Sequence, residues 1–194
     1  MNHCSIKKFI TDKERDVLVK YFKDEIERGD YATGSDVCKF YKPEWFVINN
    51  DVHGHHMYVD HILERINNYF SDTENCVNGE REHQPIICVV PPGAEVEAHI
   101  DRFNVFKIWS GELDEDAPDD KAITKFIAFI NKPDNSSKFY IDNVEIETEE
   151  TELIIFEPSE KVHEVTKNLS QDHVIILIFA RITDISDQWF KSIQ

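Results

Sequence analysis

The chain has 194 residues, of which 41% are hydrophobic and 30% are charged, and its formal net charge is -17. This length suits one domain over residues 1–194 with a substantial core. An acidic surface repels nucleic acid and anionic lipid, because phosphate binding needs clustered Lys and Arg. We therefore expect neither nucleic acid nor a membrane as a partner.

The cysteines and the N-terminus indicate the compartment. Cys4, Cys38, Cys76 and Cys88 are scattered and form no C-x-x-C pair, which argues against a zinc knuckle or a disulfide scaffold. The first residues lack the apolar core of a signal peptide, and no stretch approaches the roughly 20 apolar residues of a membrane span. These features predict reduced thiols and a cytoplasmic location.

The N-terminal part, residues 1–80, predicts two helices. Thr11-Asp12-Lys13-Glu14 reads as a capping box, and apolar residues at helical spacing follow as far as Ile26, with Gly29 as the expected end. A second amphipathic helix is expected from about Tyr58 to Phe70. The aromatic-rich stretch between the helices, Phe40 to Asn50, is expected to be partly extended.

Residues 81–183 predict a set of short strands. The tail, residues 184–194, predicts a short helix or an irregular end. Helices followed by many strands indicate a mainly β domain, in which helices pack against a β-sandwich or barrel. The expected strands are Ile86–Val90, Val96–Asp101, Ile123–Ile130, a hairpin over Phe139–Ile146 with Asp142-Asn143 in its turn, Leu153–Phe156 and His173–Arg181.

An acidic segment, residues 111–120, interrupts these strands. Its Gly, its Pro and its many like charges are incompatible with a core element, so it reads as a solvated surface loop. The alternative is a mobile lid that attracts a cationic substrate, because the segment closely follows the strand Val96–Asp101.

Three side chains have the composition of a metal site. His99 and Asp101 are two residues apart on one predicted strand, so both point to the same side and can bind one ion. A third ligand must come from a distant strand, and His163 is the candidate. Two imidazoles and one carboxylate form the facial triad of non-haem Fe(II), which leaves coordination positions open. A structural pair of His99 and Asp101 without metal is the alternative.

A second histidine-rich segment, Asp51 to His56 with Asp60 and His61 nearby, has no spacing that matches a ligand set. It reads as a surface loop leading into the second helix. A contribution to a substrate pocket is the alternative.

The downstream segment resembles the aspartyl/asparaginyl β-hydroxylase family of 2-oxoglutarate- and Fe(II)-dependent oxygenases, whose pattern some proline hydroxylases share. The resemblance extends over about residues 86–181. It implies a double-stranded β-helix, also called a jelly roll or cupin-like core, with iron held at its mouth by His99, Asp101 and His163. It also implies Fe(II), 2-oxoglutarate and O2. The residues that carry it are Asp142-Asn143-Val144, Glu149 through Pro158, His163-Glu164-Val165 and Asn168.

The family's basic residue for the far carboxylate of 2-oxoglutarate stands ten positions after the second metal histidine, where this chain has His173. Arg is usual there because it can bind a carboxylate through two parallel hydrogen bonds, whereas a protonated imidazole offers fewer donors. Lys125, on the strand Ile123–Ile130, and Arg181, further along the strand that starts at His173, are further candidate cations. The departure at His173 implies altered affinity, a different 2-oxo acid or lost activity.

The resemblance implies a dioxygenase that hydroxylates an amino-acid side chain of the Asp/Asn or Pro type, free or in a polypeptide. The acidic surface favours a cationic substrate. Two alternatives stay open: a jelly-roll binding module without turnover, and a cupin-like enzyme with another metal and no 2-oxo acid. Replacing Asp101 with Ala is expected to abolish Fe-dependent turnover and to leave the fold intact.

Overall fold

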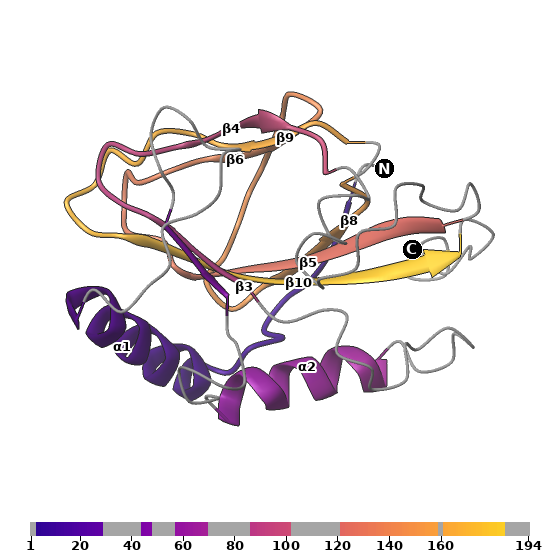
Figure 1. Ribbon diagram of the computed structural model, residues 1–194, viewed down its shortest axis with the longest axis horizontal. Coiled ribbons are helices and arrows are strands. Elements are labelled where there is room, and N and C mark those ends of the chain that lie inside the picture. Colours follow the sequence, from indigo (N-terminus) through magenta and orange to yellow (C-terminus); the bar gives the residue numbers. More distant parts are fainter. Residues whose placement is uncertain are drawn as a thin grey trace.

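The computed structural model describes residues 3–28, 44–47, 57–69, 86–101, 121–158 and 161–184. Two antiparallel sheets face each other, and two helices cover the outer face of the larger sheet (Figure 1). The six-stranded major sheet has the order β1 (Cys4–Ile6), β8 (Leu153–Phe156), β5 (Lys121–Asn131), β10 (Val174–Asp184), β3 (Ile86–Val90) and β2 (Glu44–Val47). The four-stranded minor sheet has the order β4 (Val96–His99), β9 (His163–Val165), β6 (Phe139–Ile141) and β7 (Val144–Ile146).

The connectivity defines the fold class. Among the described strands from β3 onward, the chain passes repeatedly between the major and the minor sheet, and only the hairpin β6–β7 keeps two successive strands in one sheet. This winding gives a double-stranded β-helix, so the predicted fold class is confirmed. The predicted tail beyond Asp184 lies outside the described residues, as does the acidic segment 111–120.

The major sheet is apolar on both faces, which explains the continuous apolar run of β10. Ile175, Leu177 and Phe179 pack with the helices, and the intervening Ile176 and Ile178 pack toward the minor sheet. The residues that the helices contribute to the first cluster are Leu18, Phe22, Val59, Ile62 and Ile66.

The two helices, α1 (Asp12–Arg28) and α2 (Met57–Tyr69), are connected through Glu14. The capping box is confirmed, because the Glu14 amide donates to Thr11 Oγ1 while the Thr11 amide donates to the Glu14 carboxylate. The same buried carboxylate accepts two hydrogen bonds from Arg65 of α2, at 2.8 and 2.9 Å. Neither of these described helices has the length and apolar character needed to cross a bilayer.

We expect Glu14→Gln to lower the free energy of unfolding at pH 7 by about 2 kcal/mol, since hydrogen bonds to a charged group are among the stronger ones. Burial raises the pKa of Glu14, but the hydrogen bonds from Arg65 and Thr11 outweigh it and hold the pKa below 4.5. A lowered folded pKa means that the stabilisation is present above the unfolded pKa and is lost as pH falls through the folded one. Urea denaturation of both proteins from pH 7 to pH 3 measures this, and a stability difference that does not shrink with acid contradicts the role of the charge.

The hairpin between β6 and β7 turns at Asp142-Asn143, as predicted. Their φ angles of 51° and 63° are both positive, which is the pattern of a type I′ turn. The turn is also tied to the segment before β9, because the Asp142 amide donates to Val162 O and the Val162 amide donates to Asp142 Oδ1. The hairpin therefore helps to position the strand that begins at His163.

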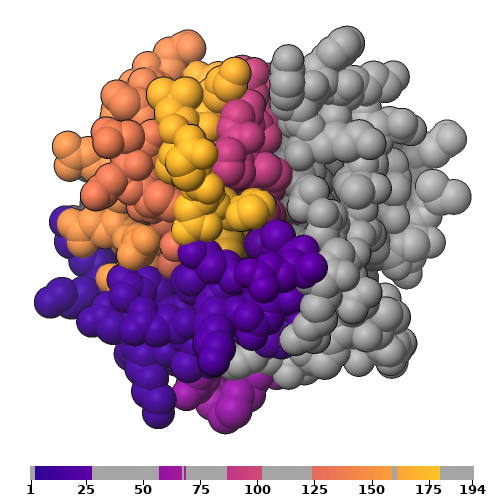
Figure 2. Space-filling view, turned by 90° about the vertical axis from the view of Figure 1, so that its left-hand side faces the viewer, coloured from indigo at the N-terminus to yellow at the C-terminus, as the bar shows by residue number. Residues whose placement is uncertain are grey.

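The two ends of the barrel differ. At one end, loops 91–95, 131–138 and 166–173 lie side by side above α1, as Figure 2 shows from that side. Asn168 closes this end, because its buried side-chain amide donates to the carbonyls of Val90 and Asp172. The ends of β4 and β10 both point toward the opposite side in Figure 1, and we call that end of the barrel its mouth.

Candidate metal centre

The three predicted metal ligands meet at this mouth. His99 is the last residue of β4, His163 is the first residue of β9, and the two are directly paired across the strands. Asp101 follows two residues after His99, and its amide donates to Pro158 O at 2.9 Å. One ligand atom from each side chain lies within 4.8 Å of the others. Strand pairing therefore brings together residues that are far apart in the sequence.

The backbone orients both imidazole rings in the same way. His99 Nδ1 lies 2.7 Å from Glu97 O, and His163 Nδ1 lies 3.0 Å from Lys161 O. A carbonyl oxygen only accepts, so Nδ1 must be the donor in each ring. In the neutral ring this leaves the lone pair on Nε2. Metal-binding histidines usually donate a hydrogen bond from the other ring nitrogen in this way, which fixes the tautomer and the orientation of the ring.

The donor set fits a divalent metal ion. His99 Nε2 lies 3.4 Å from Asp101 Oδ1, and His163 Nε2 lies 3.8 Å from the same oxygen. Two lone pairs and a carboxylate oxygen that face one another attract a positive charge, and a divalent ion can take all three as ligands. The set also matches the ligands of the two-histidine, one-carboxylate triad, for which Fe(II) is the usual metal.

The two buried ligands hold the protonation states that a metal requires. Burial lowers the pKa of His163 to about 3, with a further contribution from the nearby Lys125 charge, so the ring is neutral at physiological pH. Burial raises the pKa of Asp101, but Lys125 and the contact with His99 outweigh it and keep the pKa well below its usual range. The Phe156 ring packs edge-on against His163, with 5.0 Å between ring centroids.

Lys125 is the predicted co-substrate residue that the structure brings to the triad. Its Nζ lies 2.6 Å from Asp101 Oδ2, in an ion-pair contact whose direction does not give a hydrogen bond. The same Nζ lies 3.4 Å from His163 Nε2. Its strand neighbours on the same face, Ile127 and Phe129, belong to the apolar interior between the sheets. Lys125 thus brings a positive charge into the apolar space between the two sheets.

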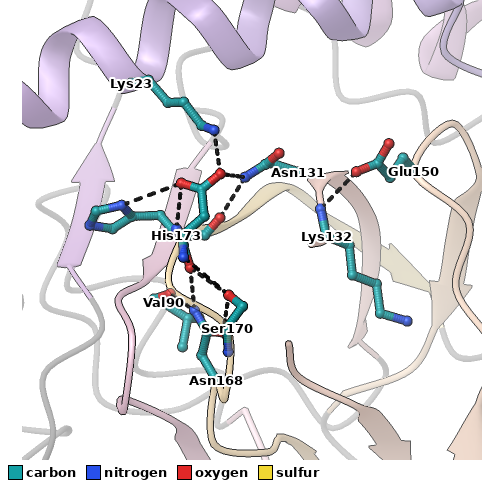
Figure 3. Close-up of polar contacts among 9 residues, drawn as sticks. Lys23, Val90, Asn131, Lys132, Glu150, Asn168, Ser170 and His173 are labelled. Atoms are coloured by element: carbon teal, nitrogen blue, oxygen red, sulfur yellow. Dashed lines mark hydrogen bonds and ion pairs between the residues drawn. The ribbon is translucent and has the colours of Figure 1, made fainter. Parts of the chain in front are cut away.

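His173 is not brought to the triad. It lies just before β10, at the closed end of the barrel, and Figure 3 shows it beside α1 and the loop of Asn168. Its Nδ1 lies 3.9 Å from Asp172 Oδ1, and its carbonyl accepts a hydrogen bond from Asn131. The partner of Lys125 on β10 is Ala180. His173 lies seven positions before Ala180, which corresponds to about 23 Å along a strand.

Arg181 lies in β10 with its backbone paired to Thr124. Thr124 and Lys125 are consecutive on β5 and so belong to opposite faces of the sheet. The Arg181 side chain lies outside the described part of the structure. The same holds for the histidine-rich segment 51–56, whereas His61 lies on α2, where its ring is 5.9 Å from that of Tyr58.

Sequence reasoning missed the carbonyls that orient the ligands. Glu97 O, Lys161 O and Pro158 O leave no trace in the sequence, because every residue has a carbonyl. The contact between Lys125 and Asp101 was also missed, although its signal was present. A single lysine interrupts the otherwise uncharged run Ile123–Ile130, and such a residue needs a buried partner.

Comparisons with known proteins agree with this arrangement of strands. No protein-family model matches the chain, and no curated protein matches it significantly in sequence. A prolyl-4-hydroxylase from Pseudomonas putida is similar in structure, with a TM-score of 0.65 at 16% identity over 93% of this chain and 92% of that one.

Two further solved structures are similar. The viral collagen prolyl hydroxylase of Paramecium Bursaria Chlorella virus-1, in complex with 2-oxoglutarate, has a TM-score of 0.62 at 17% identity, over 93% of this chain and 96% of that one. A prolyl hydroxylase from Trichoplax adhaerens, in complex with a hypoxia-inducible factor peptide, has a TM-score of 0.61 at 13% identity, over 97% and 86%. The chain therefore shares the double-stranded β-helix fold with these three prolyl hydroxylases.

Proposed function

We propose that this protein is a 2-oxoglutarate- and Fe(II)-dependent dioxygenase that hydroxylates an amino-acid side chain. The observation that carries the proposal is the convergence of His99, Asp101 and His163 at the mouth of the barrel, with their ligand atoms within 4.8 Å of one another. The fold supports it, because the similar solved structures include prolyl hydroxylases. The resemblance of the sequence to the aspartyl/asparaginyl β-hydroxylases adds the Asp/Asn type of side chain to the Pro type.

The overall reaction balances as 2-oxoglutarate, O2 and a C–H bond of the substrate giving succinate, CO2 and the hydroxylated product. When bound, Fe(II) supplies the activation of oxygen that couples decarboxylation of the 2-oxo acid to hydroxylation. His99 and His163 would bind the ion through Nε2, and Asp101 through Oδ1. The carbonyls of Glu97 and Lys161 keep both imidazoles in the ligating tautomer.

The remaining residues of the site would bind the co-substrate and keep water out. Among the described cations, Lys125 is the one beside the candidate ligands, which supports a role for it in pairing with a carboxylate of the co-substrate. His173 stays second to it, because His173 pairs with Asp172 at the closed end. Arg181 stays a candidate on its sequence position alone. The apolar interior around Ile127 and Phe129 excludes water, which strengthens each electrostatic contact at the mouth.

The substrate follows from charge and from the structural neighbours. A net charge of -17 favours a cationic partner. One neighbour is a collagen hydroxylase and another was solved with a peptide, which favours a polypeptide over a free amino acid. We therefore propose a Pro, Asp or Asn side chain flanked by basic residues, and a cytoplasmic location, in line with the scattered cysteines of the sequence.

A peptide panel tests the proposal. Peptides containing Pro, Asp or Asn, each with basic or acidic flanks, are incubated with protein, Fe(II), 2-oxoglutarate and 18O2. We expect one class with basic flanks to gain a single 18O atom by mass spectrometry while succinate forms, and His163→Ala to do neither. An exposed histidine on α2 gives a matched control, since His61→Ala leaves the triad unchanged. No 2-oxoglutarate-dependent succinate with any peptide contradicts the proposal.

One observation favours a second candidate, a binding module without turnover. The Lys125 ammonium already contacts Asp101 and His163, so it neutralises the Asp101 carboxylate without a metal ion. A module of this kind would bind no divalent metal in the micromolar range, and equilibrium dialysis against Fe(II), Mn(II) and Zn(II) separates it from the enzyme. A site that binds metal but not 2-oxoglutarate would instead be the cupin-like enzyme.

A further inference from the structure

A groove lies at the closed end of the barrel, away from the candidate metal centre. It has a volume of about 970 Å³ and is lined by the loop 131–138, by the segment 145–151 and by the first turn of α1. A smaller hollow of about 500 Å³ along α1 shares Arg15 and Glu150 with it, so the two are continuous. None of the three candidate metal ligands lines the groove.

Two buried hydroxyl groups line this groove without a partner. The side chains of Ser136 and Ser137 are only 9% and 3% exposed, and neither Oγ atom has a hydrogen bond. The hydroxyl of Ser170 in the neighbouring loop, by contrast, lies 2.7 Å from Asn168 Oδ1 and 2.8 Å from Asp172 O. A hydroxyl that is buried and unpaired destabilises the fold. A ligand that offers both donors and acceptors, as a polypeptide backbone does, would satisfy the two serines.

The charges of the groove favour a basic ligand. Five acidic and four basic side chains line it, within a chain whose net charge is -17. Two of the basic side chains are already paired, because Lys138 lies 2.8 Å from Glu145 and Arg15 lies 2.8 Å from Glu150. Asp134 is exposed in the turn that forms one rim of the groove. Its carboxylate is therefore accessible to a cation brought by the ligand.

We infer that this groove docks an extended, basic segment of a polypeptide. Ser136 and Ser137 bind the backbone of that segment, and Asp134 pairs with one of its basic side chains. The inference rests on the proposed function in one respect, since it identifies the docked polypeptide as the substrate whose other part reaches the metal centre.

The distance between the two sites sets the length of such a substrate. Lys132 of the groove stands seven positions after Lys125, which contacts Asp101, and this corresponds to about 23 Å along a strand. An extended chain spans at most about 3.3–3.6 Å per residue, so at least about seven residues must separate the docked segment from the hydroxylated residue. Docking holds the substrate near the metal centre and is equally strong before and during the reaction. It therefore lowers KM and leaves kcat unchanged.

The first experiment measures docking without turnover. The metal-free, full-length protein is titrated into a fluorescent peptide that alternates Lys and Gly, and into one that alternates Glu and Gly, and anisotropy is recorded. We expect the Lys peptide to bind more tightly. Asp134→Lys is expected to raise its Kd about 10-fold, as for the loss of a hydrogen-bonded charge. The matched control is Glu64→Lys, the same charge reversal at an exposed position of α2, which is expected to leave the Kd unchanged.

The serines give a second readout that a merely structural role would not produce. Ser136→Ala combined with Ser137→Ala is expected to raise Tm by about 2–4 °C, because it removes two unpaired buried hydroxyls, and yet to raise the Kd for the Lys peptide about 10-fold. Ser170→Ala removes a hydroxyl that has partners and is expected to lower Tm instead.

Three results overturn the inference: equal weakening by Asp134→Lys and Glu64→Lys, tighter binding of the Glu peptide, or an unchanged Kd in the double serine variant. Since none of these measurements involves turnover, each leaves the proposed function standing. Docking without any 2-oxoglutarate-dependent turnover would instead contradict the proposed function alone. With turnover, we expect a Lys-rich segment to lower KM in the wild-type protein but not in Asp134→Lys, and only when its spacer exceeds about seven residues.

Discussion

Replacing Asp101 with Ala is expected to reduce metal affinity by more than about 100-fold, because changes to the contacts that merely orient metal ligands already cost 10–100-fold. The same change is expected to lower the free energy of unfolding by about 3–5 kcal/mol, since it leaves the buried Lys125 ammonium without its counter-charge. The sequence-based expectation that the fold stays intact remains a prediction, and the ion pair adds to it an expected loss of stability. Calorimetric metal titration and urea denaturation measure the two effects.

A double variant separates the two roles of Asp101. Asp101→Ala combined with Lys125→Met removes both charges of the pair, so most of the lost stability is expected to return. Metal binding is not expected to return, because the carboxylate ligand is still absent. A double variant that stays as unstable as Asp101→Ala contradicts the ion pair as the cause, and an Asp101→Ala protein that binds metal normally contradicts the triad.

Replacing Phe139 with Ala is expected to cost about 3–5 kcal/mol, the usual range for a buried Phe. The ring is 2% exposed and lies between two other aromatic rings, at 5.9 Å from Phe129 and 5.8 Å from Phe156. These contacts join the minor sheet to the major sheet, so their loss opens a cavity in the middle of the barrel. Thermal denaturation is expected to show a midpoint lower by roughly 10 °C.

The matched control lies on the same hairpin. Val144 is 54% exposed, and Val144→Ala is expected to change stability by less than about 0.5 kcal/mol. Comparable losses for Phe139→Ala and Val144→Ala would mean that the hairpin, rather than the aromatic contacts, determines the stability of the barrel.

Much of the fold could be predicted because local signals agree with the tertiary structure. The capping box at Thr11 and Glu14 begins α1, and Asp142-Asn143 forms the turn with two positive φ angles. The strands β3 and β8 begin and end where the apolar runs predict them. The strand β1 was not predicted, since three residues give too little alternation, and pairing with β8 alone defines it.

That the three candidate ligands lie together could be predicted, and the position of His173 could not, for a geometric reason. His99 and Asp101 share a strand, and their spacing alone places them together. A spacing of ten residues between His163 and His173 instead crosses the loop 166–173, whose path is fixed by Asn168 and Asp172. That loop leaves His173 at the closed end. The number of residues between His163 and His173 therefore does not determine at which end of the barrel His173 lies.

The measurement that tests the central claim most directly is an anaerobic titration of the Fe(II)-loaded protein with 2-oxoglutarate, followed by visible absorption. Chelation of Fe(II) by the 2-oxo acid produces a metal-to-ligand charge-transfer band. We predict a saturable band in the wild-type protein and in His61→Ala, and none in His163→Ala. Stoichiometric iron without a band in the wild-type protein would contradict 2-oxoglutarate as co-substrate, and a failure to bind iron would contradict the metal centre itself.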